Sequence, residues 1–333
     1  MKRLWYFGSF LVAAATTASA QVSITGQESV DKAVTGLQVN ISTMDRTYMP
    51  VTIDTKQTKV DPSTTRSESV MRARLNDGSY FDFRNTTATT QQLNSNTAQT
   101  VIEIVDSDRQ GGERTTRRVT SETTKTATGE RSETSTYRRD SSGKLVLDGE
   151  VASTTKKNPD GSLSTVSIDK RMGVGGALQP EKQVDQTVTE RGPNEKQVTS
   201  RIMTVNHLDG SLAVSSRETA TIRTDGNTTS TETLIQKPSG TTWQNTGKIV
   251  TKETRQPDGS MQRETVEEGL AAYTQKDQGG VRPLVPQRKI VESEIRKPDG
   301  TVVIDRGVYR RDVNGDWKPA TFSVEAAAQA TSY

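Results

Sequence analysis

Hydrophobic and polar residues alternate along much of this chain with the period of two that is typical of β-strands. Val214 and Ile222 have the same parity, and residues of one parity lie on one face of a strand. Ser216 and Glu218 share that face, so the alternation is weak. Helical spacing is not sustained beyond two turns, apart from an Ala-rich stretch at 324–330. The pattern therefore predicts a chain made almost entirely of strands.

Turn signals separate these strands at regular intervals. The dipeptide Asp-Gly occurs at 77–78, 160–161, 209–210, 225–226, 258–259 and 299–300. The Asp side chain hydrogen-bonds its own backbone, and Gly accepts the left-handed conformation of a bulged hairpin. Because Gly-bearing turns follow one another every 14 to 19 residues, we expect strands of roughly 10–15 residues, longer than usual.

Internal similarity indicates that the chain is built from repeated hairpins. Residues 248–260 align with 289–301, and residues 137–143 align with 309–315. Gly149, Gly247 and Gly307 each follow a turn by several residues, where a glycine inside a strand favours a bulge or bend. The predicted fold is an all-β, elongated antiparallel β-hairpin repeat array. It is a meander of long strands in an open or curled sheet, and the sequence does not decide whether that sheet closes.

The chain divides into unequal parts. We expect a signal peptide at 1–20, an irregular N-terminal segment at 21–65, the β-hairpin repeat region at 66–325 and a C-terminal tail at 326–333. Gly- and Pro-rich stretches predict breaks in the repeat at 172–180 and 277–286. A Thr/Asn/Gln-rich stretch at 86–99 is expected to be a loop.

The first twenty residues have the three parts of an export signal. Lys2 and Arg3 are followed by an apolar run, and Ala18-Ser19-Ala20 is a small-residue cleavage site. We therefore expect an exported chain that begins at Gln21 and resides in the periplasm, at the cell surface or outside the cell. The apolar run is too short for a permanent membrane helix, so no transmembrane segment is expected after cleavage.

The distribution of charge argues against a nucleic-acid partner, and the cysteine content excludes disulfides. The chain has 44 basic and 41 acidic side chains, and two of the basic ones lie in the predicted signal. Both signs are interleaved along the rest, as at 113–122, whereas nucleic-acid binding requires a concentrated basic surface. No nucleic-acid partner is expected. The chain contains no cysteine, so its stability must come without disulfides.

One stretch resembles a known repeat. Tyr137-Arg-Arg-Asp140-Ser-Ser-Gly143-Lys-Leu is similar to the tyrosine-aspartate (RHS-type) repeats of bacterial surface and toxin-shell proteins. That family places Tyr directly before Asp and Arg after Gly. The resemblance covers about two units, and we carry over no function from it.

Candidate chemistry is sparse. The single histidine, His207, precedes an Asp-Gly turn, and no Gly-x-Ser-x-Gly motif accompanies it. Asp312, Asn314 and Asp316 place oxygen ligands at alternate positions, which makes them a weak calcium site. Trp317 stands where a calcium loop needs Gly, and Ser323 stands where it needs Glu, so a simple hairpin turn is favoured. No catalytic residue and no cofactor is predicted.

Carboxylates could in principle hydrolyse glycosidic bonds if two of them were paired. The glutamates of the C-terminal third are Glu253, Glu264, Glu267, Glu268, Glu292 and Glu294. All of them stand among Arg, Lys and Thr, which favours cross-strand ion pairs. A carboxylate-based glycan enzyme is therefore the third hypothesis.

The leading hypothesis is an exported, non-catalytic structural or surface-interaction protein. The alternative is a secreted or periplasmic module that binds glycan or cell wall, using Trp243, Tyr309 or Trp317. The expected partners are cell-surface or polysaccharide components. Exposed edge strands would also allow self-association.

Overall fold

The structure is a computed structural model that describes residues 51–74, 79–107, 113–173, 175–206, 209–271, 282–312 and 314–320. Within these ranges the chain forms seventeen strands and no helix. The strands are β1 (Val51–Asp61), β2 (Thr64–Arg74), β3 (Tyr80–Gln92), β4 (Thr97–Ser107), β5 (Glu113–Thr126), β6 (Gly129–Arg139), β7 (Leu145–Lys157), β8 (Leu163–Met172), β9 (Leu178–Gly192), β10 (Glu195–Val205), β11 (Leu212–Asp225), β12 (Thr228–Ser239), β13 (Thr242–Arg255), β14 (Met261–Leu270), β15 (Leu284–Arg296), β16 (Val302–Arg311) and β17 (Trp317–Pro319).

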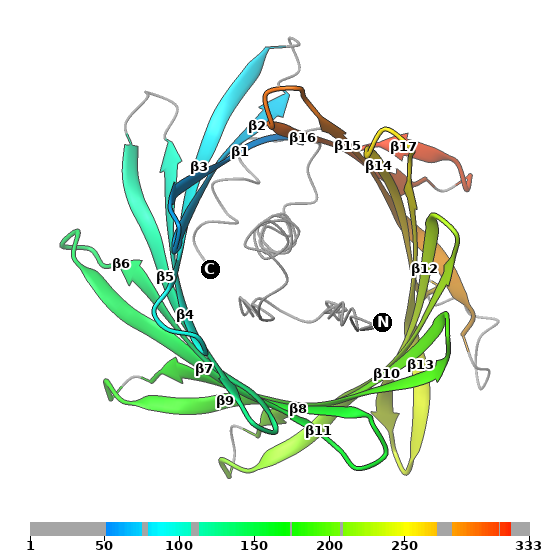
Figure 1. Ribbon diagram of the computed structural model, residues 1–333. Helices are drawn as coiled ribbons and strands as arrows, with labels where there is room; N and C mark the ends of the chain where they lie inside the picture. The colour runs from blue at the N-terminus through cyan, green and yellow to red at the C-terminus, as the bar shows by residue number, and fades with distance from the viewer. Residues whose placement is uncertain are drawn as a thin grey trace, which may run out of the picture.

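The strands form one antiparallel sheet that closes on itself. Each strand pairs with the strand before it and the strand after it, and β1 also pairs with β16. The result is a closed barrel of sixteen strands, seen along its axis in Figure 1, with β17 added to β16. The predicted all-β hairpin meander is confirmed, and the curled sheet continues until its two edges meet. Closure removes the free edges that an open sheet would expose.

The Asp-Gly turns have the predicted conformation wherever the structure describes them. Gly161, Gly259 and Gly300 have φ values of +84°, +82° and +82°. In the turn that contains Gly161, the Asp160 carboxylate accepts a hydrogen bond from the Ser162 backbone N–H at 2.9 Å. The strands from β1 to β16 are 10 to 15 residues long, the length that the turn spacing indicates.

Several predicted boundaries differ from the structure. Residues 51–65, expected to be irregular, supply β1 and the start of β2, and most of 86–99, expected to be a loop, belongs to β3 and β4. At 172–180, the chain turns between β8 and β9, which pair directly. Residues 282–286 of the second expected break reach into β15, which pairs with β14. The predicted signal at 1–20, residues 21–50 and the tail at 326–333 lie outside the described residues.

Besides register shifts in the β1–β2 and β9–β10 ladders, seven β-bulges of one kind occur in alternate ladders of the barrel. They lie between β2 and β3, β4 and β5, β6 and β7, β8 and β9, β10 and β11, β12 and β13, and β14 and β15. The extra residue is always on the second strand of the pair, close to the turn that joins the two strands. Bulges bend strands and increase their twist, so this repeated feature curves the wall. The predicted bulges beside Gly149 and Gly247 are confirmed, whereas Gly307 lies in an unshifted register with β15.

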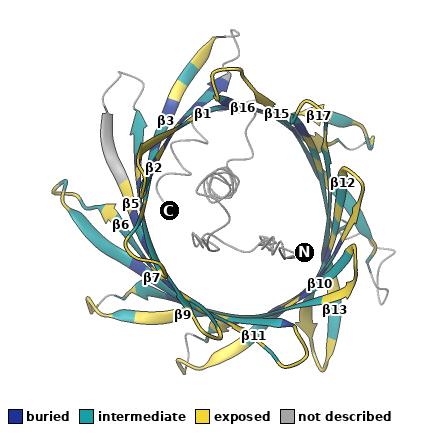
Figure 2. Ribbon diagram, in the orientation of Figure 1, coloured by how far each residue is buried: buried dark blue, intermediate teal, exposed yellow. Residues whose placement is uncertain are grey.

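Apart from the bulges, the buried residues of each strand have one parity and lie on one face of the sheet. On the concave side of a closed wall, side chains converge and cover one another, whereas on the convex side they spread into solvent. We therefore assign the buried parity to the inner face. Figure 2 shows the exposed residues gathered at the hairpin ends, with the buried ones along the strands.

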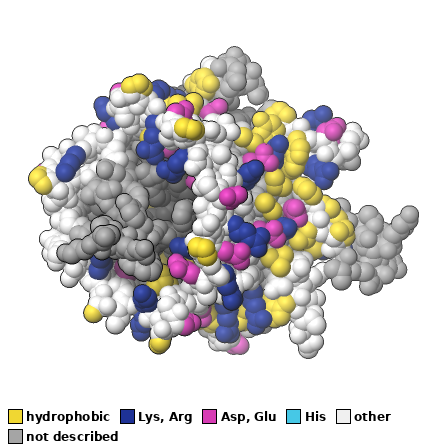
Figure 3. Space-filling view, turned by 45° about the vertical axis from the view of Figure 1, so that its right-hand side comes forward, with side chains coloured by type: hydrophobic (Ala, Val, Ile, Leu, Met, Phe, Trp, Pro, Cys, Tyr) yellow, Lys and Arg dark blue, Asp and Glu magenta, His cyan; other side chains and the backbone are white. Residues whose placement is uncertain are grey.

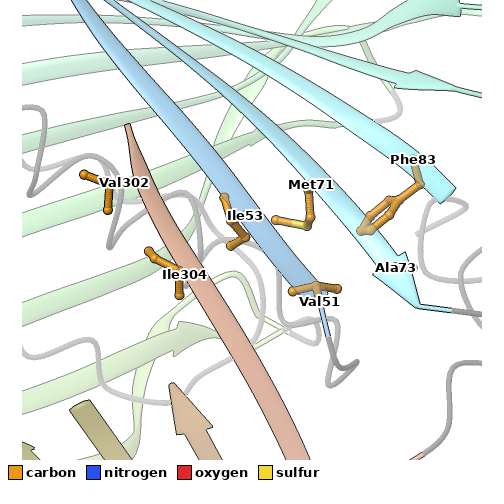
Figure 4. Packing of buried hydrophobic residues seen from close by; sticks show 7 residues of the cluster. All are labelled: Val51, Ile53, Met71, Ala73, Phe83, Val302 and Ile304. Carbon is orange, nitrogen blue, oxygen red and sulfur yellow. The ribbon is translucent and has the colours of Figure 1, made fainter. Parts of the chain in front are cut away.

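The inner face combines small apolar clusters with paired hydroxyl groups. One of them, which we call the apolar cluster, consists of Val51, Ile53, Met71, Ala73, Phe83, Val302 and Ile304, which extend over β16, β1, β2 and β3 (Figure 4). Another joins Val198 on β10 to Ala220 and Ile222 on β11. Elsewhere, neighbouring strands pair hydroxyls, as where Thr55 and Ser69 approach to 2.8 Å and Ser121 and Thr134 approach to 2.9 Å. The chain therefore closes its wall without a thick hydrophobic core.

The outer face is charged and polar. Arg72 on β2 contacts Asp54 on β1 and Asp82 on β3, which forms a three-strand row of alternating charge. Figure 3 shows Lys and Arg beside Asp and Glu over the outer wall, with hydrophobic side chains between them. The outer face therefore combines ion pairs with hydrophobic side chains.

A substitution at Gly149 tests the close backbone approach beside the β6–β7 bulge. A Cβ at this position would lie 2.7 Å from the Lys170 backbone oxygen, so Gly149→Ala should destabilise the protein by about 1–3 kcal/mol through overpacking. Gly192→Ala is the control, because its Cβ would meet nothing within 4 Å. Urea unfolding should show the control unchanged or slightly stabilised. Equal stability of the two variants would contradict the backbone approach at Gly149.

Candidate functional site

A row of four charged side chains, two of them buried, crosses four strands of the inner face. Glu253 on β13 lies opposite Arg263 on β14, Arg263 opposite Glu292 on β15, and Glu292 opposite Arg306 on β16. We call these four residues the charge ladder. Acid and base alternate because each strand contributes one member at the same register position. The meander therefore brings together residues that are up to 53 positions apart in the sequence.

Direct hydrogen bonds connect the members of the charge ladder. Arg263 donates from Nη2 to Glu253 Oε2 and from Nη1 to Glu292 Oε2, both at 2.9 Å. Arg306 donates from Nε to Glu292 Oε1 at 2.8 Å. The side chains of Glu292 and Arg306 are only 9% and 8% exposed. Glu292 thus has an arginine on each side in a dry environment, where charge-assisted bonds are strong.

Two members of the charge ladder have pKa values that favour their charged forms. Burial alone would raise the pKa of Glu292, but the charges of Arg306 and then Arg263 outweigh it and hold that pKa below the ordinary value. Burial would lower the pKa of Arg263, but Glu292 and then Glu253 outweigh it and raise that pKa. A general acid or base needs a pKa near the working pH. Glu292 is moved away from that range, so the charge ladder suits structure better than proton transfer.

A second charged group lies at two of the bulges. Asp148, the extra residue of the β6–β7 bulge, accepts from Arg138 Nε at 2.6 Å and from Arg171 Nη1 at 3.2 Å. Arg171 Nε lies 3.2 Å from an oxygen of Glu181, the extra residue of the β8–β9 bulge. Its members are more exposed than the charge ladder, with Arg138 at 62%. These bulges direct their extra residues into ion pairs.

The predicted calcium residues lie in the hairpin turn between β16 and β17. Asp312 Oδ1 accepts the backbone N–H groups of Asn314 and Asp316, each at 2.9 Å. Gly315 has φ of +88°, and Lys318 Nζ lies 3.8 Å from the other Asp312 oxygen. Asp140 makes the same two backbone bonds in the turn between β6 and β7. One Asp312 oxygen is thus engaged in shaping the turn, which is the role that the sequence favours; calcium binding stays a weak prediction.

The three aromatic residues that could bind glycan occupy two separate places. Arg217 lies over the Trp243 ring, with 4.1 Å to its centroid. Lys289 lies over both Tyr309 and Trp317, at 5.5 Å and 5.6 Å. The structure therefore brings Tyr309 and Trp317 together beside one cation on β15–β17, while Trp243 has its own cation contact on β13.

The hairpin tips of β9–β10 and β11–β12 form a shallow pocket that is open to solvent. Arg191, Glu195, Arg223 and Asp225 supply its charged lining. Arg223 donates from Nε to Glu195 Oε2 at 2.9 Å. The pocket lies at one rim of the barrel, where adjacent hairpins meet.

The sequence predicts cross-strand ion pairs for the six glutamates but does not name their partners. The structure shows such pairs for Glu253, Glu267 and Glu292, with Arg263, Arg288 and Arg306. Glu294 instead pairs with Arg296 of its own strand. Arg263 and Arg306 were not singled out, because only the strand register shows that they adjoin Glu292. His207 lies outside the described residues. Across the described ranges, no group of three or more His, Cys, Asp and Glu is placed to hold a metal ion.

Comparisons with known proteins give no relative: no family model, no curated protein and no solved structure matches the chain. The described part of the chain also contains no helix long and apolar enough to cross a membrane.

Replacing Glu292 tests the charge ladder. Glu292→Gln leaves Arg263 and Arg306 buried beside a neutral group, and breaking a buried pair in this way costs about 3–5 kcal/mol. The control is Glu133→Gln, whose pair with Arg131 is mostly exposed at 61% and 64% and should change stability by less than about 0.5 kcal/mol. Urea unfolding measures both. A Glu292 variant as stable as the control would show that the charge ladder contributes nothing.

Acid should weaken the same interaction. Since the pKa of Glu292 is lowered from 4.5 in the folded protein, the unfolded state binds the proton more readily. Glu292 thus stabilises the fold fully above about pH 4.5, and this contribution is lost as the pH falls through the lowered value. We expect the stability difference between wild type and Glu292→Gln to shrink in unfolding curves measured from pH 6 to pH 3. A constant difference would contradict the lowered pKa.

Proposed function

We propose that this chain is an exported, non-catalytic structural or surface-interaction protein. One observation carries the proposal: the most buried carboxylate of the charge ladder, Glu292, is ionised and lies between two arginines. This side chain serves the wall of the barrel, and its lowered pKa makes it a poor proton donor at neutral pH.

The architecture supports a scaffold that displays hairpins. The meander places alternate hairpin turns at opposite ends of the barrel, so hairpin turns surround each end (Figure 1). Loops on a rigid scaffold are a common place for binding residues. Asn194 and Asn227 lie at exposed tips of one rim, and Thr241 lies at an exposed tip of the other. In this proposal the partners are cell-surface or polysaccharide components that these tips contact.

Export is part of the proposal. We expect the mature chain isolated from its host to begin at Gln21, because Ala18-Ser19-Ala20 has the pattern of a signal cleavage site. Mass spectrometry of the N-terminal peptide measures this directly. A chain that retains residues 1–20 and stays in the cytoplasmic fraction would contradict export.

Photo-cross-linking in the host tests the display role. A photoreactive amino acid at Asn194, Asn227 or Thr241 should cross-link to an envelope component, because these tips face outward from the rims. The control is Thr134, which is buried on the inner face. Cross-links from Thr134 but from none of the tips would overturn the proposal in favour of an internal site.

A glycan-binding module is the second candidate, and one observation favours it. Tyr309 and Trp317 lie on adjacent strands beside Lys289, all within reach of one sugar ring or acidic group. The double variant Tyr309→Ala/Trp317→Ala should lose at least tenfold in binding on glycan arrays or isolated cell wall. Trp243→Ala, the matched control, should keep it. Loss in neither variant, or no binding by the wild type, would exclude this candidate.

A further inference from the structure

The barrel has one ladder that is much shorter than the others. Within the described residues, the β1–β16 ladder runs from Val51–Arg306 to Thr55–Val302, which is five residue pairs. The other ladders of the barrel have nine to twelve pairs, as in β7–β8 and β12–β13. We call the β1–β16 ladder the seam. It is also the only ladder of the described barrel that joins distant parts of the chain rather than successive strands.

The seam is held by backbone pairing and by side chains that both strands contribute. Val302 and Ile304 of β16 belong to the apolar cluster with Val51 and Ile53 of β1 (Figure 4). On the outer face, Thr52 donates to Asp305 at 3.4 Å. Every one of these contacts links an N-terminal strand to a C-terminal strand.

Beyond the seam, β16 pairs with a different strand. Tyr309, Arg310 and Arg311 pair with Pro319, Lys318 and Trp317 of β17. The edge of β16 is therefore divided between five residues of β1 and three of β17. Such divided pairing provides less continuous backbone bonding than the long ladders elsewhere in the wall.

We propose that the seam opens and that β1 of one copy then pairs with β16 of a second copy in the same register. The partner follows from complementarity: β16 of a second copy offers β1 the same five backbone pairs and the same apolar side chains. Exchange of identical elements between copies is a low-cost route to assembly, because the pairing broken within one chain forms again between two chains. The closed barrel is the more populated form at low protein concentration, because β1 and β16 are tethered in one chain. The population of the exchanged form increases with protein concentration.

The exchanged contact joins two different surfaces, the β1 edge and the β16 edge. Such a heterologous contact gives closed rings or open chains of copies. This inference rests on the proposed structural role and names a partner for it, namely a second copy of this chain.

A mixture of two single-cysteine chains tests the inference. Thr52 and Asp305 lie opposite each other across the seam, and the chain has no cysteine of its own. Full-length Thr52→Cys and Asp305→Cys chains, one enlarged by a tag, are mixed at a series of concentrations and oxidised. Opposite residues of neighbouring strands have Cβ atoms close enough for a disulfide after small movements.

The expected product on a denaturing gel is a mixed dimer of one large and one small chain that increases with concentration. The control mixture is Thr199→Cys with Thr219→Cys, which lie opposite each other in the long β10–β11 ladder and should give only background. A Thr52/Asp305 mixed dimer no stronger than this background, at every concentration, overturns the inference.

A double-cysteine chain, studied before and after oxidation, distinguishes failure to fold from failure to exchange strands. A single chain carrying both Thr52→Cys and Asp305→Cys should form an internal disulfide at low concentration, which shows that the seam is formed. Once locked in this way, it should lose the ability to assemble with concentration in analytical ultracentrifugation. Internal disulfides without any mixed dimer would exclude the exchanged partner, while the rim cross-links that test the display role would be unaffected.

Discussion

The whole barrel depends on backbone pairing that continues around the wall without a free edge. Each strand from β1 to β16 has a hydrogen-bonded neighbour on both sides. This constraint explains how a chain with only 30% hydrophobic residues can form a defined wall. In a closed sheet the strands satisfy their own polar backbone groups, and side chains need only cover the concave face. Thr–Thr and Ser–Thr pairs do much of that covering, together with apolar clusters beside the seam and on β10–β11.

Closure also explains why charged residues can be buried on the inner face. The charge ladder places Glu253, Arg263, Glu292 and Arg306 on successive strands, so each charge meets an opposite one. A slip of one residue in any of these registers would turn a strand's whole inner set to the outer face. The charge ladder therefore opposes misregister as well as contributing stability. Buried ion pairs gain little over apolar packing but are costly to break, which suits a role in defining register.

The sequence predicts the local features of this fold well. Asp-Gly turns, strand length and two of the three expected glycine bulges follow from short-range chemistry, since a turn depends on a few adjacent residues. Two local predictions are wrong. β1 was missed at 51–61 because no Gly-bearing turn marks its start, and 86–99 was assigned to a loop because Thr and Asn dominate it, although Thr pairs well across strands.

The long-range features could not be predicted. The pairing of β1 with β16 depends on how much all the bulges and the twist of sixteen strands curve the sheet, and no local sequence pattern determines that total curvature. The charge ladder has the same origin. Glutamates among arginines indicate ion pairs, but the choice of Arg263 and Arg306 for Glu292 requires the register of three strands. Tyr309 and Trp317 likewise meet only because β17 turns back on β16.

Amide hydrogen exchange at single-residue resolution along β1 tests closure most directly. In a closed barrel, successive amides of Val51–Thr55 point alternately to β2 and to β16. We therefore predict that all of them exchange far more slowly than in the unfolded chain. If every second amide of this stretch exchanged at the unfolded rate, β1 would be the free edge of an open sheet, and the closed barrel would be wrong.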